Sequence, residues 1–478
     1  MNLEDLLYPL LQSYTASPAW VKRSVGAVYA AMPRMVRFGP GYERWAAVAR
    51  ERDPQALQRL ATEGLRTTLR EALENVPAFT DFRALARELE DPHAVLRRLP
   101  TCSKADLKAD LHLFASSRFG LARLETFTGG STSEPLRFYL HAGVTRTKEY
   151  AFIADFHARL GMTDADISLA LRGRTVPSAA RGGALWMYEP IKRWLIVSSD
   201  HLEPRFMPQY VEAMRQWKPT VVSANPSGVY PLAKWLKAHP APDVTGRIKG
   251  VALFGENLYE HQLATLREVF RCPVLNHYGH SERVLMAAAI PGDDRLYFWP
   301  QYGHVELVDA QGAAITEPGV VGEIVGTSFD NRVMPFVRYR TGDLGAWSAA
   351  PSKGPAGFPV LEQFEGRLQE FVVCSDRRLV TVATLGAAHF SELADVGAIQ
   401  YEQREPGRII LRVETAVALS ARARARVEQA VFDKTQGGCR VSVEEVASLP
   451  RTGRGKRSLL IQNLDLGEYL GASHTGGF

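Results

Sequence analysis

The chain has 478 residues, of which 46% are hydrophobic and 23% charged, so it is too long for one compact core and we expect two or three domains. Its net charge of +5 does not indicate nucleic-acid binding, because 57 basic residues are mixed with 52 acidic ones. The four cysteines form no CxxC pair, which argues against a disulfide framework or a zinc ribbon.

The start of the chain and its apolar runs bear on location. Glu4 and Asp5 stand where a secretory signal carries basic residues. No uninterrupted apolar run approaches the ~18 residues that a membrane span needs. We therefore expect no membrane span and a cytoplasmic location.

The first 115 residues lack strand alternation and predict helices with Pro-rich breaks. Residues 51–74 form the clearest helical stretch, and Ser103 is placed to cap a further helix. We expect residues 1–115 to be a helical segment of a larger N-terminal domain.

From about residue 165 the pattern changes to short apolar runs that alternate with amphipathic helices, which indicates parallel βαβ units. Three predicted strands, at 219–223, 250–254 and 273–276, run into polar, glycine-containing loops at 225–228, 255–257 and 277–282. Ligands bind outside the carboxyl ends of strands in open α/β sheets. The three loops therefore predict one shared site.

Beyond Tyr302 the predicted strands are shorter and antiparallel in character, and the Pro/Gly-rich stretch 349–359 predicts an exposed loop. After a boundary near Gly366, the remaining residues have strand, helix and strand patterns that suit a small α+β domain. The expected fold class is α/β. Residues 116–365 would form the core of the N-terminal domain, with a small β subdomain, and residues 366–478 a mobile C-terminal domain.

A loop rich in glycine, serine and threonine occupies residues 126–135, ahead of an apolar strand-like stretch at 136–140. Exposed backbone NH groups and small hydroxyls can hold phosphate oxygens without a fixed cation. A polar turn between two strands explains this loop equally well when it is taken alone. The GxxxxGK(S/T) pattern of a Walker A loop does not occur here.

Glu282 closes a Tyr-Gly-His-Ser-Glu segment that is not a nucleophile elbow, because GxSxG would need glycine where the chain has Arg283. A carboxylate beside a phosphate loop is a candidate ligand for Mg²⁺, which on ATP is held by one or two carboxylates plus phosphate oxygens and water. The alternative is a surface glutamate in a loop.

Two further residues are candidates for nucleotide binding. Asp343 follows a tight turn, where it can accept hydrogen bonds from two adjacent ribose hydroxyls or from its own backbone. Lys456 lies on a glycine-flexible basic loop near the end of the chain. Such a loop either reaches a phosphate site or stays solvated.

The order of these segments resembles the adenylate-forming superfamily of acyl-CoA synthetases, peptide-synthetase adenylation domains and luciferases. The likeness covers residues 100–460 approximately and includes a Gly-Arg hinge at 366–367. The phenylacetate-CoA ligase group, and its capsular-polysaccharide-associated CapK branch, are similar at 75–77, 99–107, 128–132, 276–283 and 331–343. The resemblance implies that ATP activates a small carboxylic acid as an acyl-adenylate, with release of pyrophosphate and then transfer to CoA or an amine.

The resemblance also implies a role for each matching position. The ATP phosphates would be bound by Thr128, Gly129, Gly130, Ser131 and Thr132. Other nucleotide contacts would come from Gly255 and Glu256 beside adenine, Tyr278 stacked on it, Gly279, Ser281, and Asp343 at the ribose. The catalytic set would be Lys456, which bridges the substrate carboxylate and the α-phosphate, Glu282 with Mg²⁺, and Arg367 after the hinge glycine.

Three positions depart from the family pattern. Ser133 replaces a glycine and Leu136 a lysine of the phosphate loop, so the grip on pyrophosphate would be weaker or supplied differently. Gln369 replaces the usual hinge Asp or Lys, which bears on the second half-reaction. These changes leave open a degenerate nucleotide-binding protein without ligase activity. No structural zinc is expected, because the Cys/His cluster of some relatives is absent from 287–290.

Overall fold

The computed structural model describes residues 14, 17–118, 120–128, 136–172, 176, 178–179, 183–199, 201–202, 204–256, 258, 260–367, 371–385, 398–415, 418–449 and 459–469. Several predicted site residues lie outside this part of the chain: Gly129, Gly130, Ser131, Thr132 and Lys456, together with Ser133 and Gln369. The side chain of Arg367 also lies outside it.

The amino-terminal part is helical, as predicted. Its elements are α3 (Ala19–Ala31), α4 (Arg34–Phe38), α5 (Tyr42–Ala49), α6 (Pro54–Asn75), η2 (Pro77–Glu88), α7 (Pro92–Arg97), α8 (Lys104–Ala109) and η3 (Leu111–Phe114). Asp53 caps α6 by accepting a 2.7 Å hydrogen bond from the Ala56 amide. Ser103 caps α8 in a reciprocal capping box with Asp106, so the cap predicted at Ser103 is confirmed. No helix among the described residues is long and apolar enough to span a membrane.

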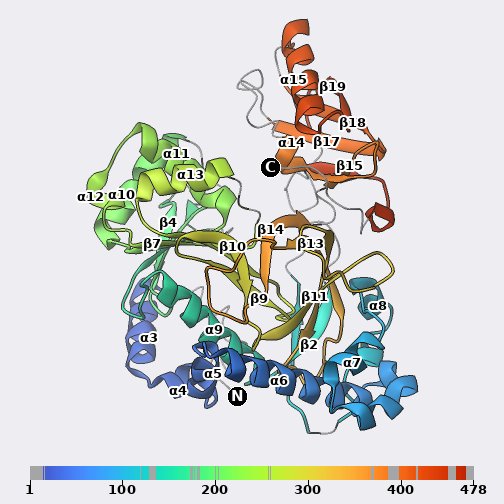
Figure 1. The fold of residues 1–478 in the computed structure, drawn as a ribbon. Helices are drawn as coiled ribbons and strands as arrows, with labels where there is room; N and C mark the ends of the chain where they lie inside the picture. The colour runs from blue at the N-terminus through green and yellow to red at the C-terminus, as the bar shows by residue number, and fades with distance from the viewer. Residues whose placement is uncertain are drawn as a thin grey trace.

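A twelve-stranded sheet forms the centre of the molecule (Figure 1). Its strands are β3 (Ser168–Leu171), β4 (Trp186–Glu189), β5 (Trp194–Val197), β6 (Val221–Ala224), β7 (Gly250–Phe254), β8 (Val274–Gly279), β9 (Met286–Ile290), β10 (Asp293–Phe298), β11 (Gly303–Val308), β12 (Val321–Ser328), β13 (Tyr339–Trp347) and β14 (Val360–Arg367). The order is β11-β12-β13-β14-β10-β9-β8-β7-β6-β3-β5-β4. Strands β5, β3, β6, β7 and β8 are parallel, and the strands beyond Tyr302 are antiparallel, both as predicted. This run of antiparallel pairing begins earlier than predicted, at β9. The prediction of shorter strands beyond Tyr302 is wrong, because β12, β13 and β14 have 8, 9 and 8 residues and pair over most of their length, whereas β3, β5 and β6 have 4 each.

Helices cover both faces of the parallel strands, which explains why those strands are mostly apolar and buried. The helices of this region are α9 (Thr145–Arg159), α10 (Met207–Trp217), α11 (Pro226–Ala238), α12 (Pro242–Thr245) and α13 (Glu260–Phe270), with η5 (Pro204–Phe206) ahead of α10. On one face α10, α11 and α13 contribute to the core around Leu169, Val222 and Val251. On the other face Phe152 and Phe156 of α9 pack with Phe254 and Leu275.

Two boundaries differ from the sequence prediction. Strand β8 runs on to Gly279, so Tyr278 and Gly279 belong to the strand and not to the loop that follows it. The added length comes from antiparallel pairing with β9, in which Tyr278 faces Ala287. Helix α11 begins at Pro226, inside the predicted loop 225–228, because proline suits the first position of a helix.

The antiparallel part of the sheet is strongly curled. Four strand spacings separate β8 from β13, in the order β8-β9-β10-β14-β13, and on a flat sheet they would measure about 19 Å. Yet the Tyr278 hydroxyl of β8 donates a 2.9 Å hydrogen bond to Asp343 of β13. The curl is filled by apolar side chains that include Phe138, Leu285 and Phe336.

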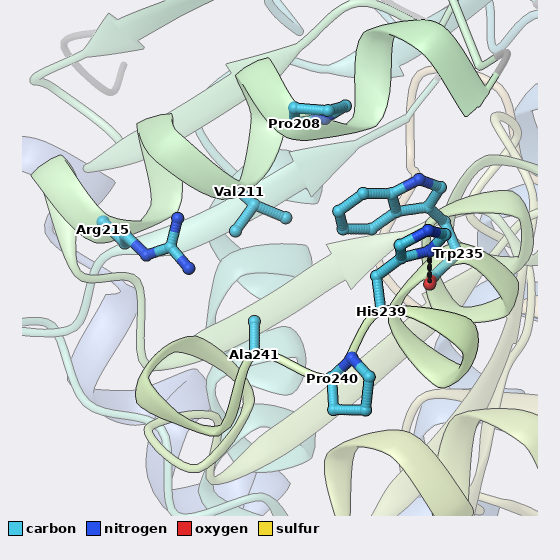
Figure 2. Close-up of a pocket in the computed structure, with 7 residues that line it drawn as sticks. All are labelled: Pro208, Val211, Arg215, Trp235, His239, Pro240 and Ala241. Atoms are coloured by element: carbon cyan, nitrogen blue, oxygen red, sulfur yellow. Dashed lines mark hydrogen bonds between the residues drawn. The ribbon is translucent and has the colours of Figure 1, made fainter.

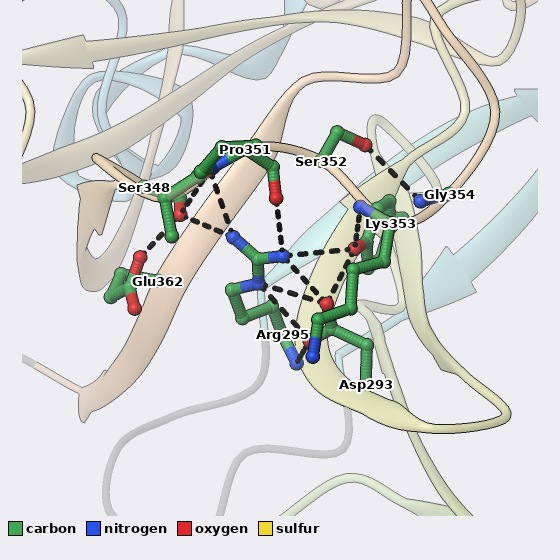
Figure 3. A network of polar contacts seen from close by, with 10 residues as sticks. Asp293, Arg295, Ser348, Pro351, Ser352, Lys353, Gly354 and Glu362 are labelled. Carbon is green, nitrogen blue, oxygen red and sulfur yellow. Dashed lines mark hydrogen bonds and ion pairs between the residues drawn. The ribbon is translucent and has the colours of Figure 1, made fainter.

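The loop at 349–359 is held firmly at one point, although many of its side chains are exposed as predicted (Figure 3). Arg295 of β10 donates to Asp293 at 2.6 Å and to the carbonyls of Ala350 and Pro351 at 3.0 and 2.9 Å. The Arg295 hydrogen bonds lower the pKa of the Asp293 carboxyl to about 2. This network fixes the strand crossing from β13 to β14.

The remaining elements form smaller sheets. A hairpin of β1 (Arg123–Phe127) and β2 (Arg137–His141) precedes the central sheet. Beyond β14 follow β15 (Phe371–Val373), β16 (Leu379–Thr381), α14 (Val382–Leu385), β17 (Ala398–Glu405), β18 (Arg408–Glu414), α15 (Ala421–Lys434), β19 (Arg440–Val446), β20 (Leu460–Gln462) and η9 (Leu466–Tyr469). The four-stranded sheet β19-β18-β17-β20 carries α15, in the α+β pattern predicted for these residues. The division of the chain into domains at 115 and 365 stays a prediction.

Candidate nucleotide site

The carboxyl ends of β6, β7 and β8 lie side by side, because these strands are parallel neighbours. The Asn225 side chain, after β6, donates a 3.0 Å hydrogen bond to the Phe254 carbonyl at the end of β7. The Glu256 carboxylate accepts from the Ser227 amide at 3.0 Å and its hydroxyl at 2.9 Å. Two of the loops predicted to share a site are therefore in direct contact, and Glu256 caps the start of α11.

Gly255 has a backbone conformation that favours glycine, with φ +70°. Gly279, at the end of β8, also needs the absence of a side chain, because a Cβ there would lie 2.9 Å from the His277 ring. Ser281 is exposed in the turn that follows β8. Gly255 and Gly279 thus place no side chain at the carboxyl edge of the sheet, so a ligand could come close to the backbone there.

Tyr278 and Asp343 form the central contact of the site. The Tyr278 ring is buried, and its hydroxyl donates to Asp343 Oδ2 at 2.9 Å. Burial, and then the neighbouring Asp343 carboxylate, raise the pKa of Tyr278 well above its usual range, so the hydroxyl stays a donor. Asp343 is half-buried and accepts this bond while it remains partly open to solvent.

Glu282 is almost fully buried, with 3% of its surface exposed, and is not the surface glutamate of the alternative interpretation. The Tyr339 hydroxyl donates to its Oε1 at 2.7 Å, and the Lys104 ammonium lies 3.7 Å from the same oxygen. Burial alone would raise the pKa of this carboxyl. The nearby His280, Lys104 and Tyr339 outweigh burial, so the pKa of Glu282 is lowered and the group is an anion.

Lys104 and Tyr339 were given no role by the sequence, although both lie in stretches that resemble the phenylacetate-CoA ligase group. The backbone explains how they meet. The Cys102 amide donates to the Arg338 carbonyl at 3.0 Å, and the Arg340 amide donates to the Cys102 carbonyl at 2.7 Å. This short parallel bridge holds the start of α8 next to the start of β13. Lys104 and Tyr339 therefore both lie close to Glu282.

His280 is a further residue that the sequence did not single out. Its ring lies roughly parallel to the Tyr278 ring at 6.0 Å and to the Tyr339 ring at 6.4 Å. Both of its ring nitrogens are buried without a hydrogen-bond partner, an arrangement that is rare unless a ligand or water completes it. His280 thus lies beside the Tyr278 ring, and the stacking of adenine on Tyr278 stays a prediction.

The structure describes the predicted phosphate loop only at its two ends, up to Thr128 and from Leu136. The Thr128 amide donates to the Leu136 carbonyl and the Leu136 amide donates to the Thr128 hydroxyl, both at 2.9 Å. The Leu136 side chain is buried in the same apolar cluster as Tyr278. The Leu136 side chain therefore packs into the core, and the role predicted for this loop at the ATP phosphates stays a prediction.

The opposite face of β8 carries a second polar group. His277 and His157 lie against Phe254, with ring centroids 5.0 and 6.4 Å away, and the Arg172 guanidinium lies 4.2 Å from the same ring. Burial, and then the charge of Arg172, lower the pKa of His277 to about 3 and of His157 to about 4. Both rings are therefore neutral near pH 7, and the Nε2 atom of each is buried without a partner.

A hollow of about 280 Å³ lies elsewhere, between α10, α11 and the start of α12 (Figure 2). Its lining includes Trp235 and His239, whose rings stack 4.4 Å apart. His239 follows the last residue of α11, and the length of this helix puts it about 20 Å from the Asn225 end. The hollow is thus remote from the polar edge and has no part in the candidate site.

The other two predicted catalytic residues are Arg367 and Lys456. The Arg367 backbone pairs with Asp343 across β13 and β14, so the predicted hinge begins next to the ribose candidate. Lys456 lies outside the described residues. The structure thus brings together Gly255, Glu256, Tyr278, Gly279, Glu282 and Asp343, while the roles of all of them stay predictions.

Comparison with known proteins agrees with this geometry. Residues 177–328 match the family model "AMP-binding enzyme". The phenylacetate-coenzyme A ligase of Escherichia coli (strain K12) is 24% identical over 304 residues, which cover 60% of this chain and 66% of that protein. The Pseudomonas putida enzyme of the same name is 25% identical over 138 residues, 28% of this chain and 31% of that protein. The chain thus matches just under two thirds of the first relative and about a third of the second.

Solved structures show the same fold. A 2-hydroxyisobutyryl-CoA ligase in its postadenylation state is 18% identical, with a TM-score of 0.59 over 85% of this chain and 90% of that one. The acetoacetyl-CoA synthetase from Streptomyces lividans is 15% identical, with a TM-score of 0.50 over 70% of this chain and 53% of that one. The segment 177–328 is thus that of an AMP-binding enzyme, the fold is that of adenylate-forming ligases, and both findings support the resemblance to the adenylate-forming superfamily and its phenylacetate-CoA ligase group.

Proposed function

We propose that this protein uses ATP to activate a small carboxylic acid as an acyl-adenylate, releases pyrophosphate, and then passes the acyl group to an acceptor. The observation that carries the proposal is the pair of carboxylates at one curled sheet edge. Asp343 stays partly open beside Tyr278, whereas Glu282 is buried and anionic. A ribose and a metal-bound phosphate need these two different environments.

Asp343 would bind the ribose. A carboxylate can accept hydrogen bonds from two adjacent hydroxyls, and the Tyr278 hydroxyl holds Oδ2 in a fixed direction. The bare backbone at Gly255 and Gly279 would allow the adenine to lie close to the strand ends. Thr128 closes the neck of the loop that would hold the phosphates.

Glu282 would hold the Mg²⁺ that accompanies ATP. The residues fit such an ion, because Mg²⁺ prefers oxygen ligands and commonly takes one carboxylate in addition to phosphate oxygens and water. The Tyr339 hydroxyl and Lys104 both favour the ionised form that a cation requires. The bound ion would neutralise charge on the phosphates.

In the adenylation step, a carboxylate oxygen of the substrate forms a bond to the α-phosphorus of ATP. The bond from that phosphorus to the oxygen bridging to the β-phosphate breaks, and pyrophosphate leaves with the electron pair. The protein mainly positions the reactants and stabilises charge. Lys456, on the C-terminal loop, would neutralise the charge between carboxylate and α-phosphate.

CoA is the first candidate acceptor. The relatives with sequence likeness are named as CoA ligases, and a structural neighbour was solved with CoA in its thioesterification state at a TM-score of 0.51. An amine acceptor is the alternative that the CapK-like segments favour. Incubation with the activated acid and either CoA or an amine, followed by mass spectrometry of the product, separates the two.

Exchange of labelled pyrophosphate into ATP tests the first half-reaction. A panel of carboxylic acids with Mg²⁺ should contain at least one that supports exchange, and the acid that does so identifies the substrate class. Binding of ATP measured by calorimetry provides the comparison. A protein that binds ATP but exchanges no pyrophosphate with any acid would be the degenerate nucleotide-binding protein, which Ser133, Leu136 and Gln369 leave open.

A further inference from the structure

Exposed large apolar side chains are concentrated in one short part of the chain. Of the eight such residues among those the structure describes, five lie in or near α3 and α4. Their exposed fractions are 71% for Trp20, 38% for Val25, 58% for Val28, 54% for Met35 and 46% for Val36. Contiguous exposed apolar surface on a folded protein marks an interaction site more often than scattered single residues do.

Four exposed apolar residues of α3, namely Trp20, Ala27, Val28 and Ala31, lie within about 100° of one another around the helix, and Val25 lies further round. Trp20, Val28 and Ala31 follow one another at helical spacing and are exposed, with Ala27 between them. Gly26 is on the other side and is the one buried residue among the described side chains of this helix. A Cβ at Gly26 would lie 2.5 Å from Pro190, so α3 is seated on the β4–β5 turn by its glycine face.

A second contact, from Tyr14, also reaches the β4–β5 region next to α3. The Tyr14 hydroxyl donates to Glu189 of β4 at 2.6 Å, next to Pro190. In Figure 1, α3 and α4 form the outer flank of the molecule, beyond α9. The exposed side of α3 therefore faces away from the protein.

The charges around this apolar side are basic. Residues 14–42 contain Lys22, Arg23, Arg34 and Arg37 and no acidic residue. Arg34 and Arg37 share one carboxylate, Asp164, at 2.9 and 3.6 Å. The β4–β5 turn adds Lys192 and Arg193 beside Pro190. Asp164, and to a smaller extent Glu43, which follows this range, raise the pKa of Arg34. After Asp164, Glu189 and Glu43 are counted against the six bases, the surface keeps an excess of positive charge.

We propose that α3 and α4 form a docking surface for an anionic phospholipid membrane, on which the protein lies without spanning it. Tryptophan and aliphatic side chains flanked by basic residues are the combination that binds at the interface between headgroups and acyl chains. Lysine and arginine near anionic lipids add electrostatic attraction, which salt screens. A second copy of the chain fits less well, because a twofold contact through this surface would place its bases against the same bases.

Sedimentation with vesicles tests the proposal on the full chain. Vesicles of phosphatidylcholine with phosphatidylglycerol should bind the protein, and phosphatidylcholine vesicles alone should bind it roughly tenfold less, because the attraction to anionic lipid is lost. Binding to the anionic vesicles should fall as salt is raised. Equal binding to both vesicles, or binding to neither, would overturn the proposal.

Two variants separate the apolar and the charged contributions. Trp20→Ser with Val28→Ser and Met35→Ser should lower anionic vesicle binding more than tenfold, since these side chains supply the insertion. Arg23→Glu with Lys192→Glu, at two exposed bases, should lower it severalfold. The matched control is Arg422→Glu with Arg426→Glu, which makes the same charge change on α15, where both arginines are exposed, and should bind normally.

Controls on folding, net charge and oligomeric state complete the vesicle experiment. Circular dichroism and ATP binding should be unchanged in all variants, because the substituted residues are exposed and distant from the nucleotide site. Loss of vesicle binding by the α15 control to the same extent would reduce the effect to net charge. A dimer in light scattering that the triple serine variant dissociates, without vesicle binding by the parent protein, would assign this surface to a second copy.

Discussion

The central sheet and the C-terminal sheet hold their polar groups in different places. Strands β3, β6 and β7 are buried along their whole length, so the exposed polar side chains near them belong to the loops at the strand ends. Strands β18 and β19 alternate instead, with one side packed on Val427 and Val431 of α15. The other side carries ion pairs such as Arg412 with Glu402 and with Glu444.

The two sheets are therefore expected to contribute to different steps, one to nucleotide binding and the other to adenylation. The central sheet brings Tyr278, Glu282 and Asp343 together, since Tyr278 and Asp343 lie on two of its strands and Glu282, in the turn after β8, accepts a hydrogen bond from Tyr339 of β13. In the C-terminal sheet, charged side chains such as Arg412, Glu402 and Glu444 pair with one another. The predicted contribution of that region to adenylation comes from the loop that carries Lys456. We therefore expect nucleotide binding to depend on the first sheet and the rate of adenylation on the second.

Substitution of Lys456 should have the largest effect. Lys456→Ala should lower the adenylation rate by ~10²-fold or more, because it removes one charge-stabilising donor. Transfer from supplied acyl-adenylate should stay near normal if the C-terminal region uses another surface for that step. Lys353→Ala, at an exposed lysine of the loop 349–359, is the control. Equal losses in both half-reactions would mean that Lys456 supports the region generally, and no loss would make it a solvated loop residue.

Glu282→Gln should have the next largest effect, with adenylation impaired most strongly at low Mg²⁺. A neutral amide is a poorer ligand for a hard cation, and rising Mg²⁺ should restore part of the rate. The measurement is pyrophosphate exchange as a function of Mg²⁺ concentration. Glu317→Gln, at an exposed turn residue, should behave as the parent protein does. Full activity of Glu282→Gln at low Mg²⁺ would remove this residue from the metal site.

Asp343→Ala should weaken ATP binding by about tenfold or more, since it removes a charged acceptor from two ribose hydroxyls. Calorimetric titration with ATP measures this effect directly. The same variant should bind 2′,3′-dideoxy-ATP as the parent protein does, because that nucleotide lacks both hydroxyls. An unchanged affinity for ATP would contradict the ribose assignment and with it the role given to the central sheet.

Lys104→Ala should have the smallest effect, visible in the pH profile. Removal of a positive charge 3.7 Å from Glu282 raises the pKa of this carboxyl, which the parent protein holds below its usual range. The parent Glu282 is ionised above its lowered pKa and loses that charge as the pH falls through it. The acid limb of Mg²⁺-dependent exchange should therefore move to higher pH in the variant. Lys108→Ala, on the same helix, should leave the limb in place, and coincident limbs for all three proteins would exclude the Lys104 contribution.

Local patterns predicted the elements well, but their ends less well. The strand predicted at 250–254 is β7 as it stands, because its apolar run is bounded by glycine at both ends. The end of β8 was placed too early, since its last residues are strand only through pairing with β9. Helix α11 begins at Pro226, inside the loop predicted at 225–228. Proline at the first helical position is a local signal for that start, whereas a strand end that depends on pairing with another strand leaves none in its own residues.

The sequence by itself determined the order of segments that marks the adenylate-forming superfamily, since apolar periodicity and turn residues are local properties. Only the tertiary structure decided which side chains meet. Tyr278 and Asp343 are 65 residues apart and on strands that are not neighbours, and they bond because the sheet curls. Lys104 reaches Glu282 through a backbone bridge at Cys102, and Leu136 turns into the core. Contacts of this kind depend on strand order and curvature, which arise from the packing of the whole chain.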